Sequence, residues 1–387
     1  MSVIPADNSI AVIAALMVLS GGSMLLAKTR LGAQVTGTVI VILGAIAASN
    51  LKLIPHSAPA YDFIFTYIVP LLIPLFLFQA DLRRIVTEAS RTTGAFLLAT
   101  VGTVTGVTIA ALMLDLSGLG TGADVPAASR EAAVVGLFAS TYIGGSVNYA
   151  ALGEITGLNQ DASFFSAATA ADNLFSAVYL SLIALLPGLT VITRFFPTHT
   201  QETNIDEAPA AITEEQPMTA MSLCLAIAAS LALVALADSL EQALGLSGWR
   251  YIILTALVLA VATLVPNARH WFSGAFELGI ALSFAFFAAI AAGANIPAML
   301  SVAPLLIGMV CILLTVHLAV LLALGALCRL TLPELLTASN AAILGATTAP
   351  AMAAAKGWRD QITPGVLVGV LGYALGTFVG TALFKLW

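Results

Sequence analysis

The stretch FASTYIGGSVNY, residues 138–149, places two adjacent glycines and several polar side chains in the middle of an apolar run. Gly144 and Gly145 permit backbone conformations that other residues avoid, which releases amides and carbonyls from helical pairing. The polar side chains around this point are Ser140, Thr141, Ser146 and Asn148. A plain spanning helix would carry leucine here, and broken backbone at membrane depth is tolerated only where it lines a cavity. The stretch therefore predicts a discontinuous or re-entrant helix.

A second stretch of the same kind, SNAAILGATTAP at residues 339–350, follows 200 positions later. A shift of 200 residues aligns Gly145 with Gly345 and Gly157 with Gly357 without a gap. The candidate site residues of this copy are Ser339, Asn340, Gly345, Thr347, Thr348 and Pro350. The proline lacks a backbone N–H and so helps to hold the break. Such internal repeats are common in secondary transporters. We predict two membrane repeats, 1–190 and 219–387, around a hydrophilic linker at 191–218.

The composition indicates the broad class of the protein. Of the 387 residues, 60% are hydrophobic and 9% are charged, and the mean hydropathy is +1.02. The apolar residues form continuous runs of about 20, the length that crosses a hydrocarbon core as a helix. Expected segments lie at roughly 9–27, 33–54, 62–80, 93–114, 131–153, 162–188, 219–237, 250–266, 272–293, 302–328, 334–355 and 363–386. We therefore expect an all-α polytopic membrane protein.

The number of crossings decides how the two halves are oriented. If all twelve segments cross, the halves share one orientation, and Lys and Arg divide as 8 inside and 6 outside. If the segments at 131–153 and 334–355 are re-entrant, each half crosses five times and the halves are inverted. Lys and Arg then divide as 10 inside and 4 outside. Because cytoplasmic loops carry an excess of these residues, the inverted arrangement is favoured.

The oxygen atoms around both breaks suit more than one role. Weakly charged, oxygen-rich sites suit Na⁺, and exposed helix N-termini attract the carboxylate of a substrate. Small and polar residues also allow close packing of helices in lipid, which is the alternative for each stretch. If Na⁺ binds, its candidate ligands are Ser146, Asn148, Asp172 and Thr347.

Asp172, followed by Asn173, lies well inside the sixth apolar segment. An ionised carboxylate at this depth is costly unless it is paired, hydrated or protonated, so an intramembrane acid is a functional candidate. Asp172 would carry a proton or coordinate Na⁺; the alternative is a protonated acid that bonds to a neighbouring helix. Its counterpart 200 positions later is Gly372, so only one repeat carries the acid.

Two further features favour structural interpretations. The last segment carries Gly372, Gly376 and Gly380 at four-residue spacing, which predicts the close approach of another helix. His317 lies in the middle of the tenth segment, where hydrogen bonding between helices is at least as well supported as proton relay.

Motifs of common enzymes do not occur in the sequence. There is no Walker A sequence, which argues against ATP-driven transport by this chain. There is no His-Glu-x-x-His, Gly-x-Ser-x-Gly or metal-spaced Cys/His cluster, so we expect no enzyme and no cofactor other than Na⁺ as a coupling ion. Small core residues, rather than disulfides or metal ligands, are expected at Cys224, Cys311 and Cys328.

The sequence also resembles a known family over nearly its whole length. The stretches that carry the resemblance are Tyr142–Tyr149, Ala171-Asp-Asn-Leu-Phe175, Phe286–Ile290, Ala351–Trp358 and Thr363–Tyr373. They resemble the membrane family of domain of unknown function 819, which is grouped with the cation:proton antiporter and anion transporter superfamily. Bile-acid/sodium symporters and 2-hydroxycarboxylate transporters are among its relatives. The resemblance implies a scaffold or dimerisation domain, a core domain with two crossed or re-entrant elements, and an elevator or rocking cycle.

The sequence thus predicts a Na⁺- or H⁺-coupled transporter of a small anionic or zwitterionic organic solute. We expect a homodimer in a bacterial inner membrane, with no nucleic-acid partner. A cation/proton antiporter is one alternative. An intramembrane enzyme or a non-transporting receptor is another. The enzyme would need a group such as His317 within hydrogen-bond reach of Asp172, beside a lipid-accessible cleft and away from the glycine breaks.

Overall fold

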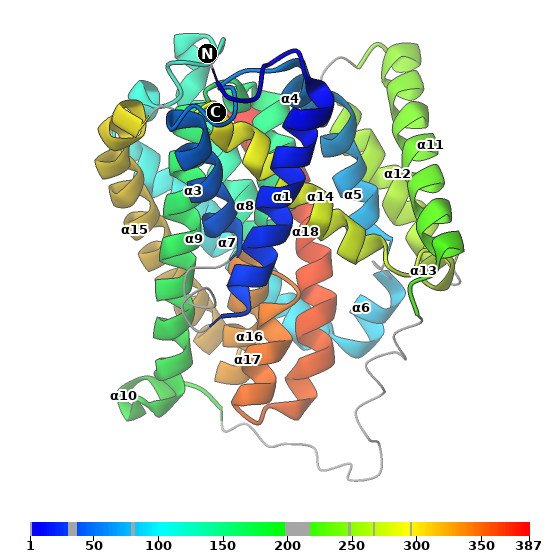
Figure 1. Cartoon of the computed structure of the whole chain (residues 1–387). Coiled ribbons are helices and arrows are strands. Elements are labelled where there is room, and N and C mark those ends of the chain that lie inside the picture. The colour runs from blue at the N-terminus through cyan, green and yellow to red at the C-terminus, as the bar shows by residue number, and fades with distance from the viewer. Residues whose placement is uncertain are drawn as a thin grey trace.

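The computed structural model describes residues 2–29, 37–78, 82–197, 217–246, 249–265, 268–294 and 296–387. Within these ranges the chain forms helices and no strands, which confirms the all-α fold (Figure 1). Most of the predicted linker, 198–216, lies outside the described residues. The division of the chain into repeats at 191–218 stays a prediction.

Each of the twelve predicted segments coincides with a helix or with consecutive helices. The first half contains α1 (Ser9–Ala27), α3 (Gly37–Asn50), α4 (Pro59–Phe63), α5 (Val69–Leu77), α6 (Leu82–Glu88), α7 (Ser90–Met113), α8 (Ala127–Thr156), α9 (Ala162–Leu185) and α10 (Thr190–Thr193). The second half contains α11 (Ala220–Leu244), α12 (Arg250–Leu264), α13 (Ala268–Trp271), α14 (Ala275–Ala292), α15 (Ile296–Leu327), α16 (Leu332–Leu344), α17 (Thr348–Ala355) and α18 (Ile362–Leu386). A π-helical turn, Ile64–Ile68, joins α4 to α5.

α8 folds back on itself, and its two arms form what we call the first hairpin. A Cβ built on Gly380 would lie 2.7 Å from the carbonyl oxygen of Gly136 and 3.2 Å from the side chain of Leu152. In a continuous helix those two residues would be about 24 Å apart. At the base of the hairpin the Gly122 amide donates to Asp161 at 2.9 Å, although one residue precedes α8 and the other follows it.

α16 and α17 form the second hairpin. The Asn340 amide in α16 lies 3.4 Å from the Met352 sulfur in α17. A Cβ on Gly365 of α18 would lie 3.0 Å from Thr337 in α16 and 3.3 Å from the Pro350 nitrogen in α17. The two segments predicted at 131–153 and 334–355 therefore both fold back as hairpins, which is the shape that a re-entrant helix has.

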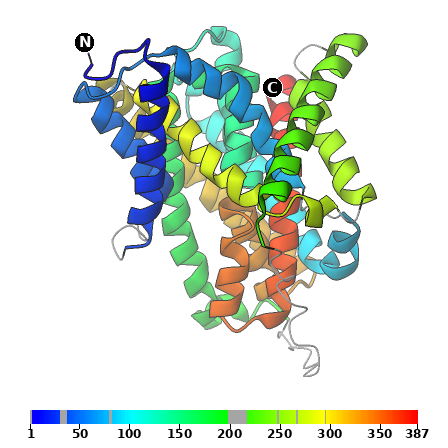
Figure 2. The same ribbon diagram turned by 45° about the vertical axis from the view of Figure 1, so that its right-hand side comes forward.

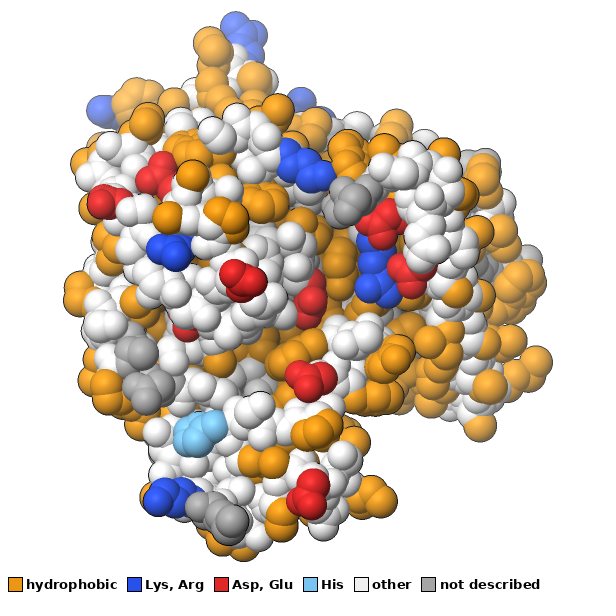
Figure 3. Space-filling view, turned by 90° about the horizontal axis from the view of Figure 1, so that it is seen from above, with side chains coloured by type: hydrophobic (Ala, Val, Ile, Leu, Met, Phe, Trp, Pro, Cys, Tyr) orange, Lys and Arg blue, Asp and Glu red, His pale blue; other side chains and the backbone are white. Residues whose placement is uncertain are grey.

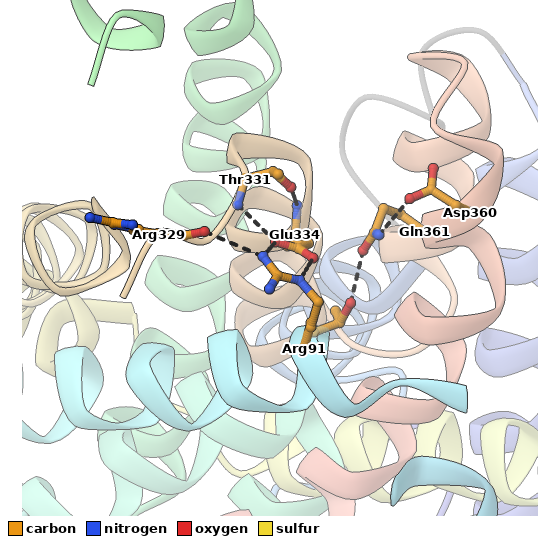
Figure 4. A network of polar contacts seen from close by, with 7 residues as sticks. Arg91, Arg329, Thr331, Glu334, Asp360 and Gln361 are labelled. Atoms are coloured by element: carbon orange, nitrogen blue, oxygen red, sulfur yellow. Dashed lines mark hydrogen bonds and ion pairs between the residues drawn. The ribbon is translucent and has the colours of Figure 1, made fainter. Parts of the chain in front are cut away.

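A polar network closes the base of the second hairpin at the start of α7 (Figure 4). Arg91 forms an ion pair with Glu334 in the first turn of α16, with an N–O distance of 2.6 Å. Glu334 also forms a capping box with Thr331, which satisfies free amides at the start of the helix. The adjacent Thr92 donates to Gln361, which follows α17, at 2.9 Å. Residues 91 and 92 thus meet both ends of this hairpin.

The two hairpins enter the molecule from opposite ends. α7 begins at the base of the second hairpin and leads, through the turn Leu116–Gly118, to the base of the first. α18 begins beside the second base and ends where Trp387 donates to Glu131, near the start of α8, at 2.9 Å. These helices have 24 and 25 residues, enough to cross a membrane. Figures 1 and 2 show α8 in the upper part of the molecule and α16 and α17 in the lower part.

The first three crossing helices of each half interlock with those of the other, and we call these six helices the outer set. α5 packs against α11 and α12, whereas α14 packs against α1 and α3. The third helix of each half therefore covers the first two of the other half, and Figure 2 shows α1 and the pair α11–α12 on opposite flanks. The hairpin set consists of α7, α8, α9 and α15 to α18. Within it, α7 lies along α15, where a Cβ on Gly102 would lie 2.8 Å from the His317 carbonyl oxygen.

Eight of the described helical spans are long and apolar enough to cross a membrane, and two further apolar helices, Ile40–Asn50 and Arg250–Leu264, are shorter. Neither hairpin is among these ten. The count agrees with five crossings per half. Seen from above, the end that carries the base of the first hairpin bears charged side chains, whereas the rim of the molecule is largely hydrophobic (Figure 3).

The prediction for the cysteines is partly wrong. Cys224, Cys311 and Cys328 are free thiols, as expected, but all three are exposed rather than part of the core. Lipid tails are as apolar as leucine, so an apolar run does not tell a residue that faces lipid from one that faces another helix.

Candidate functional site

The two aligned glycines at the breaks share one backbone conformation. Gly145 has φ 71° and ψ −169°, and Gly345 has φ 96° and ψ −174°. This region of backbone space is accessible essentially only to glycine. The second aligned pair also agrees, since Gly157 and Gly357 have φ of 77° and 76°. The alignment read from the sequence therefore has a structural counterpart at each of its four glycines.

In each hairpin a side chain bonds across the break from the same aligned position to the same aligned carbonyl. The Ser140 hydroxyl shares its one proton between the carbonyls of Leu137, at 2.7 Å, and Asn148, at 3.3 Å, and the Asn340 amide donates to the carbonyl of Thr348 at 3.3 Å. The two pairs are related by the shift of 200 residues. Ser140 and Asn340 are fully buried. These predicted site residues therefore hold the arms of the hairpins together.

Asn148 joins the first hairpin to α18. Its amide donates to the carbonyls of Gly144 at 2.7 Å and Gly372 at 3.4 Å, and its Oδ1 accepts from the Thr377 hydroxyl. A Cβ on Gly144 would lie 2.2 Å from the Gly372 carbonyl oxygen, so only glycine fits there. Gly376 packs against Asn148 in the same way. The predicted close approach of a helix to the glycine stripe is confirmed, and that helix is α8.

Asp172 is partly buried on α9 and faces the first hairpin. Its carboxylate accepts from the Thr141 hydroxyl at 3.3 Å and from the Ser176 hydroxyl, one turn later on α9, at 3.4 Å. The neighbouring Asn173 donates to the Thr169 carbonyl at 2.8 Å. Thr141 and Asp172 are thus brought together as a carboxylate–hydroxyl pair close to the first break.

The Thr348 side chain forms a hydrogen bond across the second break. Its hydroxyl donates to Asn340 Oδ1 at 2.7 Å and lies 3.3 Å from the Gly345 carbonyl oxygen. Pro350 stands in the first turn of α17, where a missing backbone N–H costs no helical bond. Thr347, beside Thr348, is exposed.

The four predicted Na⁺ ligands do not converge on one point in this structure. Ser146 and Thr347 are exposed at the two breaks. Asp172 is bound by Thr141 on the α9 side of the first hairpin, whereas the amide group of Asn148 is directed to α18. Among the described residues, no group of three or more His, Cys, Asp and Glu side chains is arranged to hold a metal ion.

Ser339 belongs to a separate buried cluster. Its hydroxyl lies 2.9 Å from His317 Nε2 and 2.6 Å from the Tyr179 hydroxyl. On the other side of the imidazole, Nδ1 lies 2.9 Å from the Thr103 hydroxyl. His317 therefore bonds between helices, in line with one of its two sequence interpretations. Thr103 and Tyr179 carried no signal in the sequence, since single hydroxyls in apolar helices are common.

Tyr373 is a further residue that the sequence did not single out. A Cβ on Gly345 would lie 3.4 Å from its hydroxyl, and a Cβ on Gly145 would lie 3.9 Å from its ring. Its ring also contacts Phe76 of α5 and Phe276 of α14, with centroids 5.6 and 6.3 Å apart. Tyr373 thus lies against both breaks and against the outer set. In the sequence, the one feature that could have pointed to Tyr373 is its position directly after Gly372, the counterpart of Asp172.

Comparison with known proteins agrees with this architecture. The model of a protein family of unknown function, DUF819, matches residues 10–386. The chain is 32% identical over 369 residues to a Bacillus subtilis (strain 168) protein described as uncharacterized membrane protein YjcL, covering 92% of this chain and 90% of that protein. A match of this extent, together with the ten apolar helices of the described ranges, shows an integral membrane protein. The chain belongs to the DUF819 family.

Proposed function

We propose that this protein is a secondary active transporter that moves a small anionic or zwitterionic organic solute, coupled to Na⁺ or H⁺, by alternating access. One observation carries the proposal. Two hairpins enter from opposite ends, and each breaks at a glycine, Gly145 or Gly345, in the same conformation and 200 positions apart. Discontinuous helices of this kind, in two inverted copies, are typical of secondary transporters. The proposal includes the inverted relation of the complete halves.

The breaks supply the groups that such a solute requires. Where an arm ends, its last carbonyls lack helical partners. The first amides of the next arm lack them too, and the N-terminus of that arm carries a partial positive charge. Arms begin in this way after Gly145 and at Thr348. The exposed hydroxyls of Ser146 and Thr347 stand at the same points. A solute carboxylate would be bound by these amides and hydroxyls without a basic side chain.

Asp172 is the proposed site of the coupling ion. It lies in a membrane-spanning helix, and intramembrane acids mark ion and proton pathways. Thr141 and Ser176 place hydroxyl oxygens beside the carboxylate, which is a set of ligands that hard cations accept. Binding of Na⁺ or H⁺ would change the charge beside the first break and so change the affinity of the site for an anion.

The alternatives differ from this proposal in identifiable ways. A cation/proton antiporter would use Asp172 for both ions in turn and would carry no organic solute. An intramembrane enzyme was expected to place His317 beside Asp172. The imidazole instead bonds to Thr103 and Ser339, and the carboxylate bonds to Thr141 and Ser176. We therefore retain the transporter.

The test uses purified protein in two steps. Thermal unfolding in detergent is measured against a panel of mono- and dicarboxylates and amino acids, with Na⁺ or with K⁺. Solutes that stabilise the protein are then tested for uptake into proteoliposomes under separate Na⁺ and H⁺ gradients. We expect gradient-driven uptake that Asp172→Asn abolishes and that Asp115→Asn, a change at an exposed loop carboxylate, leaves intact. Cation exchange without solute uptake would favour the antiporter.

The proposal extends to a homodimer in a bacterial inner membrane. Mass photometry of the protein in nanodiscs measures the number of copies per particle, and fractionation of bacterial membranes measures the location. A monomer, or enrichment in another membrane, would overturn this part alone.

A further inference from the structure

A chain of hydrogen bonds runs through the hairpin set, away from the glycine breaks. It links Tyr179 of α9, Ser339 of the second hairpin, His317 of α15 and Thr103 of α7, and it ends on the carbonyl of Tyr142 in the first hairpin. The donor–acceptor distances are 2.6, 2.9, 2.9 and 3.2 Å in that order. His317, Thr103 and Ser339 are fully buried, so water does not share these bonds.

The last acceptor determines the direction of the whole chain. Tyr142 lies in the last turn of its arm, where carbonyls have no helical donor, and a carbonyl can only accept. Thr103 has one proton, and when it donates to Tyr142 its oxygen must accept from His317 Nδ1–H. Neutral imidazole has one N–H, so Nε2 is then an acceptor for the Ser339 proton.

The chain then begins at Tyr179. Since Ser339 donates to the imidazole, its oxygen is free to accept the Tyr179 proton. Every proton in the chain has an acceptor in this arrangement. The reverse direction would leave the Tyr142 carbonyl and the Tyr179 O–H without partners, and a buried polar group without a partner is destabilising. The structure therefore assigns the neutral Nδ1–H tautomer to His317.

Protonation of His317 would break the hydrogen bond between Tyr179 and Ser339, which joins α9 to the second hairpin. Imidazolium donates from both nitrogens, so Ser339 must accept from Nε2–H and turn its own proton elsewhere. If that proton turns to Tyr179, the Tyr179 O–H loses its acceptor. If Ser339 rotates to bond its own helix, its oxygen moves away from both partners. The bond between Tyr179 and Ser339 is lost in either case.

Among the described residues, the charged side chains of the surrounding helices are bound to other partners and do not compensate a charge at this position. On α9, Asp172 is bound by Thr141 and Ser176. On α7 and α16, Arg91 and Glu334 pair with each other at the base of the second hairpin. From α9 the Tyr179 ring packs against the imidazole, with centroids 5.9 Å apart, α8 contributes the backbone carbonyl of Tyr142, and on α15 itself Cys311 and Cys328 are exposed.

We propose that His317 is a proton-binding site of this protein, neutral while Tyr179 is bound to Ser339 and protonated when α9 moves away from the second hairpin. The two events are linked, so each must favour the other to the same extent. Its role in coupling rests on the proposed transport function, but the tautomer and the linkage do not. The site is distinct from Asp172.

Nuclear magnetic resonance of protein labelled with ¹⁵N- and ¹³C-histidine tests the proposal without any solute. The chain has four histidines, and His317→Gln, or removal of His56, His199 and His270, assigns the signal of His317. We expect the Nδ1–H tautomer, with no titration of His317 between about pH 5 and 8, the range of ordinary histidines. An Nε2–H tautomer would overturn the proposal.

Protonation of His317 would leave the Tyr179 O–H without an acceptor, and Tyr179→Phe removes that hydroxyl. We expect His317 to take up a proton at a higher pH in this variant than in the parent, in titrations followed down to the acid limit of the folded protein. The matched control is Tyr61→Phe, which removes a buried hydroxyl of α4 that is bonded to the Pro55 carbonyl, away from the hairpin set, and should leave His317 unchanged. A His317 that takes up its proton at the same pH in Tyr179→Phe as in the parent contradicts the linkage. Because these measurements need no transport, their failure is distinguishable from failure of the transporter proposal, which uptake assays measure.

Discussion

Phe76 and Phe276 meet edge to face, with ring centroids 5.2 Å apart and planes at 89°, although 200 positions separate them in the chain. One lies in α5 and the other in α14, the third crossing helices of the two halves. The same shift relates the two glycine breaks. A residue that contacts its own counterpart lies on or near an axis that relates two copies. This contact therefore supports a two-fold relation between the halves independently of the hairpins.

The pair should contribute measurably to stability. Aromatic pairs of this geometry contribute about 0.5–1.5 kcal/mol beyond the apolar area they bury. We expect a double-mutant cycle of Phe76→Ala and Phe276→Ala to give a coupling energy in that range from unfolding in detergent. Phe76→Ala combined with Phe138→Ala, where the rings do not pair, is the control and should be additive. Additivity in the first cycle would show that the contact contributes nothing specific.

Alanine at either break should strain the protein. Gly145 and Gly345 have positive φ, and such conformations cost other residues of the order of 1–3 kcal/mol. We expect Gly145→Ala and Gly345→Ala to lower the unfolding temperature and to abolish uptake. Gly94→Ala is the matched control, because a Cβ there meets nothing within 4 Å and the residue is helical. It should leave stability unchanged or raise it. Equal behaviour of the three variants would contradict the assignment of the breaks.

The ion pair at the base of the second hairpin should hold that hairpin to α7. Glu334 is nearly buried, with 8% of its side chain exposed, and it bonds both Arg91 and the Thr331 amide. Hydrogen bonds to charged groups contribute about 1.5–3 kcal/mol. We expect Glu334→Gln to destabilise the protein by about this amount, and Asp115→Asn, at an exposed carboxylate, to change little. Circular-dichroism melts of the purified variants measure both, and similar melting of the two would contradict the role of the pair.

Glu154 should make stability depend on pH. It stands in the last turn of α8, outside the spanning helices, and burial raises its pKa to about 7, against the bond from Asn159 and the charge of Arg250, which lower it. The folded state therefore binds this proton more tightly than the unfolded state, and its contribution to stability falls as pH rises from about 4.5 to 7. We expect Glu154→Gln to be more stable than the parent at pH 8 and similar to it at pH 4. A constant difference across these pH values would contradict this.

The opposite entry of the hairpins predicts a labelling pattern. In a variant with Cys224, Cys311 and Cys328 replaced, we expect single cysteines at 203 or 359 to react with impermeant maleimide only from the cytoplasmic side. Single cysteines at 124 or 160, at the base of the first hairpin, should react only from outside. The orientation follows from the excess of Lys and Arg at the end of the molecule that carries the second base. Labelling of all four positions from one side would exclude the inverted arrangement.

Much of the fold was accessible from the sequence because its signals are local. The twelve apolar segments follow from run length and side-chain type, and both breaks follow from glycines whose φ no other residue adopts readily. The face of α18 that meets α8 was also accessible, because glycine at four-residue spacing leaves room for another helix whatever that helix is.

The site was less accessible, and particular residues show why. Ser339 was expected at the break, but its hydroxyl turns to His317 and Tyr179. Asn148 was expected to bind an ion, but Thr377 and Gly372 on α18 take up its amide group. Tyr373 was not expected at all, and it lies against both breaks.

By itself the sequence determined that the chain crosses a membrane as helices, where two of them break, and that the breaks recur 200 positions apart. The tertiary structure alone decided which hydroxyls face Asp172, which face His317, and that the cysteines face outward. The physical reason is that backbone breaks and apolar runs are properties of consecutive residues, whereas a polar side chain in a membrane bonds to whatever helix lies opposite. Most of the surface of that helix is as apolar as the lipid it replaces, so hydropathy does not identify which helix lies opposite.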